Sequence, residues 1–104
     1  MTQPPTRGVW LDQQTHDALA EYIWLKRTTK SDVFRAVLEE IGTTKPSASV
    51  LSTPDRTGRK RLVVKTNDEQ WQRASDAAAE AGVGFHSLVR RHIIKVLMEE
   101  GLLE

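Results

Sequence analysis

The second half of this chain repeats the first half in residue class, and this repeat restricts the fold more than any other feature. A shift of about 55 positions places like residues on one another along most of the sequence. The matched pairs are Val9 with Val64, Asp12 with Asn67, Val33 with Leu88, Phe34 with Val89, Arg35 with Arg90, Leu38 with Ile93 and Ile41 with Val96. We therefore predict two copies of one small unit.

Each copy opens with a short segment that favours an extended strand. Residues 8–11 and 61–66 are rich in β-branched, aliphatic and aromatic side chains. Asp12 and Asn67 follow these segments, and both residue types cap helices by accepting a hydrogen bond from a free backbone amide. A strand followed directly by a helix is therefore predicted in each copy.

Two apolar segments at helical spacing come next in each copy, with a break between them. The breaks are residues 27–29 and 82–84, where a glycine or a threonine cap can end one helix and start another. The second helices are expected to end near Gly42 and Gly101. Each copy is thus strand, helix, turn and helix.

The segment between the copies has the composition of a linker. Residues 43–59 hold two prolines, one glycine and several serines and threonines, with few apolar side chains. The first copy then spans 6–42 and the second spans 60–104. Because 104 residues suffice for one modest core, we expect both copies to share a single domain, 1–104.

Composition indicates a folded protein without disulfides. Hydrophobic residues make up 38% of the chain and charged residues 28%, which is a globular balance. The absence of cysteine excludes thiolate chemistry and the usual zinc-finger ligand sets. No apolar run is long enough to span a membrane, and residues 1–5 do not resemble a signal peptide. We therefore expect a cytoplasmic protein with no membrane partner.

The pattern of titratable residues does not favour catalysis or metal binding. His86 and His92 are spaced to lie on different faces of a helix, and His16 lies in the other copy. Ser87 has no third residue at helical spacing that would orient His86 as a base. No glycine-rich phosphate loop or paired carboxylate motif is present. We expect no metal site, no cofactor and no enzyme activity.

A single unit of this kind is too small to be stable alone. Its strand would lack a hydrogen-bonding partner, and about 40 residues bury too little apolar surface. Two units solve both problems if their strands pair and their helices share one core. We therefore predict a mainly α fold with a two-stranded antiparallel β ribbon, built as an intramolecular pseudo-dimer. A two-stranded ribbon has the width to enter the major groove of B-DNA.

With these elements in place, the chain resembles the ribbon-helix-helix (MetJ/Arc) family of DNA-binding proteins. Residues 9–12 are similar to the strand and cap of that family, and residues 29–35 to its turn and second helix. Residues 63–67 and 82–90 are similar to the same elements in the second copy. The resemblance covers nearly the whole chain and implies double-stranded DNA as the partner.

In that family, strand residues of one parity face the DNA while the others enter the core. The residues of the DNA-facing parity here are Arg61, Val63 and Lys65 in the second copy, and Thr6, Gly8 and Trp10 in the first. Arg and Lys suit guanine edges, and Val can touch a thymine methyl group. The first strand has few donors, so we expect base contacts mainly from the second. An ordinary solvated strand is the alternative, and the side on which Trp10 lies stays open.

The resemblance also implies phosphate contacts at the start of each second helix, where free amides and the helix dipole favour an anion. Those residues are Thr29, Lys30 and Ser31 in the first copy, and Gly84, Phe85 and His86 in the second. Ordinary helix capping is the alternative. Arg59 and Lys60, in a basic stretch before the second strand, are expected to contact phosphates as well.

The single-chain tandem form resembles the TraY-type accessory proteins of plasmid conjugation. This resemblance implies binding near a transfer origin, with a relaxase or other transfer proteins as further partners. A transcriptional repressor is the alternative among DNA-binding proteins, and a protein-interaction module is the alternative from another class. We expect a monomer in solution, with multimers on DNA as a further option.

Overall fold

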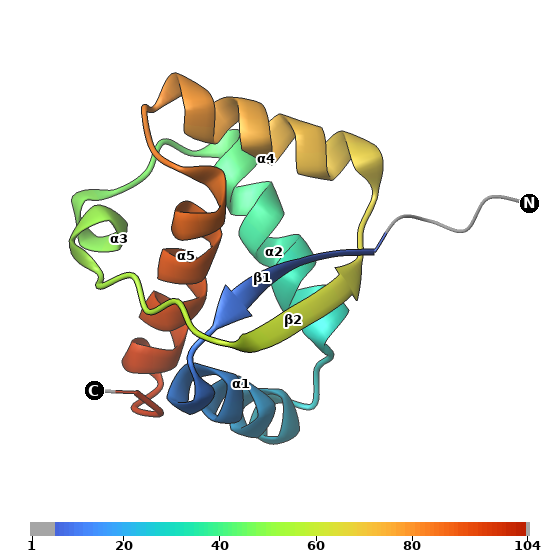
Figure 1. Ribbon diagram of the computed structural model, residues 1–104, viewed down its shortest axis with the longest axis vertical. Helices are drawn as coiled ribbons and strands as arrows, with labels where there is room; N and C mark the ends of the chain where they lie inside the picture. Colours follow the sequence, from blue (N-terminus) through green and yellow to red (C-terminus); the bar gives the residue numbers. More distant parts are fainter. Residues whose placement is uncertain (1–5, 104) are drawn as a thin grey trace, which may run out of the picture.

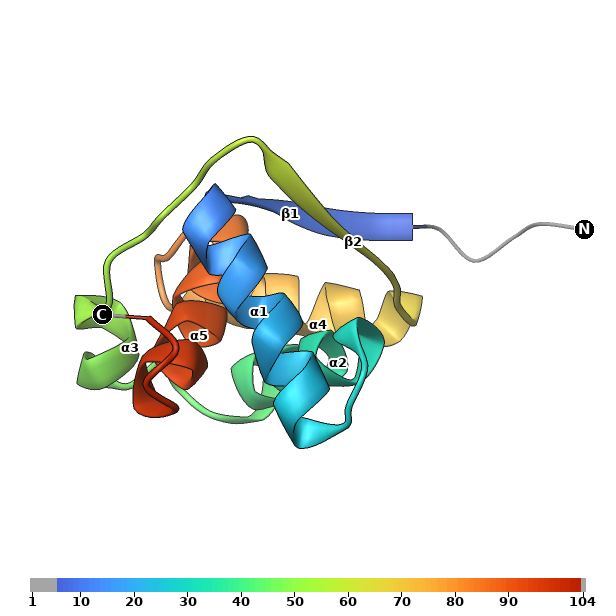
Figure 2. The ribbon, with the colours of Figure 1, turned by 90° about the horizontal axis from the view of Figure 1, so that it is seen from below.

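Two strands pair into an antiparallel ribbon, and the helices pack as a second layer beneath it (Figure 1, Figure 2). This computed structural model describes residues 6–103, with the backbone alone for Thr6, Arg7 and Lys65. The elements in chain order are β1 (Thr6–Leu11), α1 (Gln13–Lys26), α2 (Lys30–Thr43), α3 (Ala48–Ser52), β2 (Lys60–Lys65), α4 (Asp68–Glu80) and α5 (Phe85–Glu99). The predicted mainly helical fold with a two-stranded antiparallel ribbon is confirmed.

Side chains alternate between the two faces of the ribbon, with the parity that the resemblance to ribbon-helix-helix strands implied. The residues that face the helices are Val9, Leu11, Leu62, Val64 and Thr66, and all of them are buried. Gly8 lies opposite Val63 in the register of β1 and β2. A Cβ atom on Gly8 would lie 2.1 Å from the carbonyl oxygen of Leu62, so only glycine permits the strands to approach this closely.

Helix starts follow the expected capping chemistry. Asp12 accepts a hydrogen bond from the amide of Thr15 at 3.0 Å, and Asn67 accepts one from Glu69 at 2.7 Å. α1 ends at Arg27, whose φ of 52° is left-handed, a conformation that costs a non-glycine residue roughly 1–2 kcal/mol. Gly82, with φ of 74°, occupies the same kind of position after α4 without that cost.

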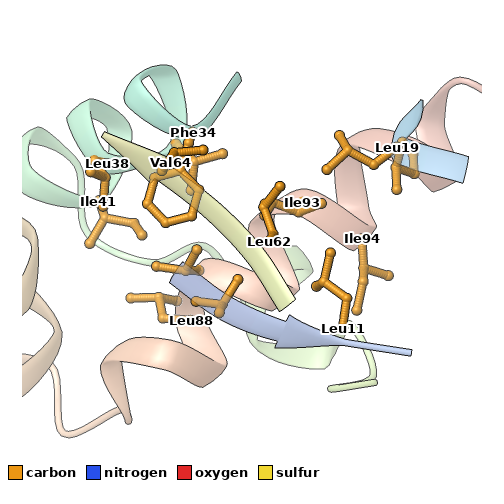
Figure 3. Packing of buried hydrophobic residues seen from close by; sticks show 14 of the residues in the cluster. Leu11, Leu19, Phe34, Leu38, Ile41, Leu62, Val64, Leu88, Ile93 and Ile94 are labelled. Atoms are coloured by element: carbon orange, nitrogen blue, oxygen red, sulfur yellow. The ribbon is translucent and has the colours of Figure 1, made fainter. Parts of the chain in front are cut away.

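The core lies between the ribbon and the helices, and it joins the two halves of the chain. α2 packs against α4 and against β2, while α5 packs against α1 and against β1. Side chains of both strands, α2 and α5 meet there (Figure 3). Phe34 of α2 also stacks on Trp71 of α4, with ring centroids 6.1 Å apart. Each half therefore completes the core of the other.

The segment 43–59, which the sequence predicts as a linker, contains a short helix that sequence analysis did not anticipate. Ser47 caps α3 by accepting a hydrogen bond from the amide of Val50 at 3.2 Å. Val50 is buried, and α3 packs against α5. A serine cap suffices for one turn of helix once a neighbouring surface covers Val50. We keep the name linker for residues 43–59.

Ion pairs hold the rest of the linker against the domain. Asp55 accepts two hydrogen bonds from the guanidinium of Arg90, one of them at 3.0 Å, and this contact lowers the pKa of the Asp55 carboxyl. Arg56 pairs with Asp12 at 3.0 Å, and its carbonyl accepts a bond from the amide of Asp12. The linker is thus attached to α5 and to the start of α1.

Candidate nucleic-acid interface

The helices lie on one side of the ribbon (Figure 2), and the other, outer face carries exposed side chains. Trp10 is 50% exposed and Val63 is 41% exposed. Arg61 is exposed and lies opposite Trp10 in the register. We call Gly8, Trp10, Arg61 and Val63 the ribbon face.

Trp10 belongs to this outer face and not to the core, which answers the question that the sequence left open. The guanidinium carbon of Arg61 lies 5.9 Å from the centroid of the Trp10 ring, within range of a cation–π contact. Each half of the chain thus supplies one member of this pair. Thr6 and Lys65 also oppose one another in the register, but their side chains lie outside the described part of the chain.

The chemistry of the ribbon face suits the edges of base pairs. A guanidinium offers donors in a fixed fork that matches the two acceptors of guanine, and an exposed valine can contact a thymine methyl group. Gly8 adds no side chain at the centre of the face, which leaves the ribbon thin there. The ribbon face thus combines the guanidinium of Arg61 with the apolar side chains of Trp10 and Val63.

The two predicted phosphate anchors lie on either side of the ribbon, at the first turns of α2 and α5 (Figure 1). At α2, Thr29 caps the helix by accepting from the amide of Asp32 at 3.1 Å, and Lys30 is exposed while Ser31 is half-buried. The remaining first-turn amides have no acceptor within a helix. The start of α2 thus combines capping with an available cation.

The start of α5 differs from the start of α2. Gly84 has no side chain with which to cap the helix, and His86 is exposed. Phe85 is half-buried, and its ring meets that of Trp71 edge to face at 4.8 Å. The side chain of Phe85 therefore serves packing, so that only its backbone amide remains available to an anion.

A hollow of about 390 Å3 beside the start of α2 adds to this asymmetry. It is lined by His16, Leu19, Ala20, Ile23, Thr28, Thr29, Lys30 and Leu62. The shift that relates the two halves carries His16 onto Trp71 and Lys30 onto Phe85. The rings of Trp71 and Phe85 pack together in the second half, whereas the matching place in the first half stays open. The matched residue classes of the two halves do not reveal this difference.

The basic residues around the start of β2 are partly available. Arg59 and Lys60 are exposed, as phosphate contacts require. Arg56, from the same basic stretch, is occupied by its ion pair with Asp12. The basic stretch therefore divides into one residue that anchors the linker and others that remain open to an anion.

The histidines do not come together. His92 is buried on α5, and desolvation lowers its pKa although Glu40 lies 3.8 Å away and opposes that shift. Within residues 6–103, no group of three or more histidine or acidic side chains could hold a metal ion. His92 is thus a neutral packing residue near neutral pH.

Comparisons with family models, with curated proteins and with solved structures find no match to this chain. The resemblance to ribbon-helix-helix proteins accordingly stays a prediction from the sequence. No helix in the described part of the chain is both long and apolar enough to cross a bilayer.

Proposed function

We propose that this chain binds double-stranded DNA by inserting the ribbon face into the major groove. The observation that carries the proposal is a ribbon whose outer side is covered by no helix of residues 6–103, and on which Trp10, Arg61 and Val63 are exposed. Large apolar side chains gathered on one exposed face often mark an interaction surface. A ribbon of two strands fits the width of the major groove, where each base pair presents a distinct pattern of donors and acceptors.

We further propose that the chain is a tandem ribbon-helix-helix pseudo-dimer. The register supports this, because the same shift of about 55 positions that aligns the two halves carries Gly8 onto its own partner, Val63. A two-fold axis through that pair would exchange β1 with β2. The same axis would exchange α1 with α4 and α2 with α5. It would therefore relate the packing of α2 on α4 to the packing of α5 on α1.

In the proposed complex, the ribbon provides specificity and its surroundings provide electrostatic anchoring. The first turns of α2 and α5 flank the ribbon, so their free amides can meet phosphates on both sides of the groove. Lys30, Arg59 and Lys60 add exposed positive charge near these positions. Because the two halves differ in sequence, the preferred DNA site is expected to be asymmetric and not palindromic.

The biological process stays a prediction from resemblance. An accessory role in plasmid conjugative transfer, with binding near the transfer origin, is the first hypothesis, and transcriptional repression is the second. The exposed cation on the ribbon favours DNA over the alternative of a pure protein-interaction module.

Selection of bound duplexes from a random pool, followed by titration of single base changes, tests the proposal. Arg61→Ala should relax preference at particular base pairs by about 1–3 kcal/mol each. Arg73→Ala is the matched control, because Arg73 is exposed on α4 and lies beside Gly42. If the folded Arg61→Ala protein keeps wild-type affinity and preference, or if the wild type does not bind duplex DNA, the proposal is wrong.

A further inference from the structure

An apolar corner protrudes from the end of α1, away from the ribbon. Trp24 is 80% exposed and Leu25 is 58% exposed, the two most exposed large hydrophobic residues in the described part of the chain. Arg27 follows them and is also exposed. Lys26 is held by Glu100 at 3.0 Å, which fixes this end of α1 against the end of α5. We call Trp24, Leu25 and Arg27 the α1 corner.

A hollow of about 510 Å3 lies at a different end of the molecule, between the ends of α2 and α4 and the start of the linker. Its lining residues are Ile41, Gly42, Thr43, Thr44, Lys45, Pro46, Leu51, Ala77, Glu80, Ala81 and Val83. Most of the side chains are small or apolar, and Glu80 and Lys45 are its charged residues. Glu80 forms no ion pair within residues 6–103. We call this depression the α4 hollow.

The α1 corner corresponds in the second half to the end of α4, which forms one wall of the α4 hollow. The shift of about 55 positions carries Trp24 onto Ala79 and Leu25 onto Glu80. Large apolar residues in the first half thus correspond to a small residue and an acid in the second. A dimer of identical subunits could not make its two corners different, whereas a single chain can.

We propose that the α1 corner of one molecule docks into the α4 hollow of a second copy of this chain. Trp24 and Leu25 would enter the depression, and Arg27 would approach Glu80. Lys45 is exposed on a long flexible side chain and can turn toward solvent. The opposite arrangement, corner against corner, would place two Arg27 side chains near one another and is disfavoured by their repulsion.

The two surfaces are placed so that both can be used at once. Figure 1 shows α1 at one end of the molecule and the C-terminal ends of α2 and α4 at the opposite end. A copy can therefore insert its α1 corner into one neighbour and accept the α1 corner of another. Such a head-to-tail contact produces an open row of molecules and not a closed oligomer. Few side chains take part, so the contact should be weak, with the protein monomeric at micromolar concentration.

Sedimentation without DNA, from micromolar to millimolar protein, tests this contact. The wild type should grow in average mass without reaching a fixed oligomer. Trp24→Ala, which loses the corner, and Ala81→Trp, which fills the hollow, should each weaken association about tenfold or more. A mixture of the two variants should form dimers, because one retains its hollow and the other its corner.

A charge exchange provides a second readout that does not alter packing. Arg27→Glu and Glu80→Lys should each weaken association, and the double variant should recover it. Glu39→Lys is the control, since Glu39 is exposed on α2 and does not line the hollow. Association of Ala81→Trp at the wild-type level, a wild type that stays monomeric at millimolar concentration, or no recovery in the double variant would overturn the proposal.

Discussion

Gly8→Ala should open the ribbon at its centre. The new Cβ atom would lie 2.1 Å from the carbonyl oxygen and 3.0 Å from the carbonyl carbon of Leu62. Both are backbone atoms, so no side chain can turn aside to relieve the contact. The strands must separate by roughly 1 Å to restore an ordinary distance, which stretches hydrogen bonds beyond their useful length.

The expected loss follows from the bonds involved. Two ladder hydrogen bonds weakened on either side of the central pair correspond to about 1–3 kcal/mol of unfolding free energy. Chemical unfolding followed by circular dichroism measures this directly. Gly42→Ala is the matched control, because its Cβ would meet only the flexible side chain of Arg73 at 3.1 Å, and alanine favours the helix by about 1 kcal/mol.

A Gly8→Ala protein as stable as the wild type, or a Gly42→Ala protein that loses as much stability as Gly8→Ala, would contradict this prediction. Wild-type stability of the Gly8→Ala protein would mean that the two strands lie farther apart at Gly8 than the structure shows. Intact stability combined with lost DNA binding would instead assign Gly8 to the contact surface alone.

Three further predictions concern burial and charge. Burial lowers the pKa of His92 below its ordinary 6.5, so the unfolded chain binds protons more readily than the folded chain does. Thermal stability should therefore fall as the pH drops below 6.5. An equal fall in the His92→Phe protein would contradict this. Trp71→Ala should cost about 1–3 kcal/mol in urea unfolding, because its half-buried ring packs on Phe34, whereas Trp24→Ala should change stability by less than about 0.5 kcal/mol. Lys30→Ala should weaken binding to all DNA sequences alike and reduce the log–log salt slope by about one unit; a loss at one base pair only would argue against a phosphate contact.

Local features of this fold could be predicted because neighbouring residues determine them. The parity implied by the resemblance to ribbon-helix-helix strands was enough to assign the inner and outer faces of β2, because successive side chains of a strand point to opposite faces. Asp12 and Asn67 marked helix starts because capping depends on residues only a few positions apart. The matching of the two halves indicated which strands would pair.

Features that depend on distant residues could not be predicted in this way. The bond between Asp55 and Arg90 joins residues whose proximity exists only once α5 has packed. The contact of Arg61 with Trp10 depends on which residues of the two strands lie opposite one another. Matching the residue classes of the two halves does not specify that register. The α4 hollow arises from small residues on two helices and the linker together, and no single segment signals it.

The anchored linker also determines how the ribbon behaves on dilution. A ribbon assembled from two separate chains loses stability as the protein becomes scarce, because its partner strand must be found in solution. Here β2 is tethered to β1, at an effective concentration of millimolar order or above that no change in expression level can lower. A cell holding only a handful of molecules would still hold each one with its ribbon assembled.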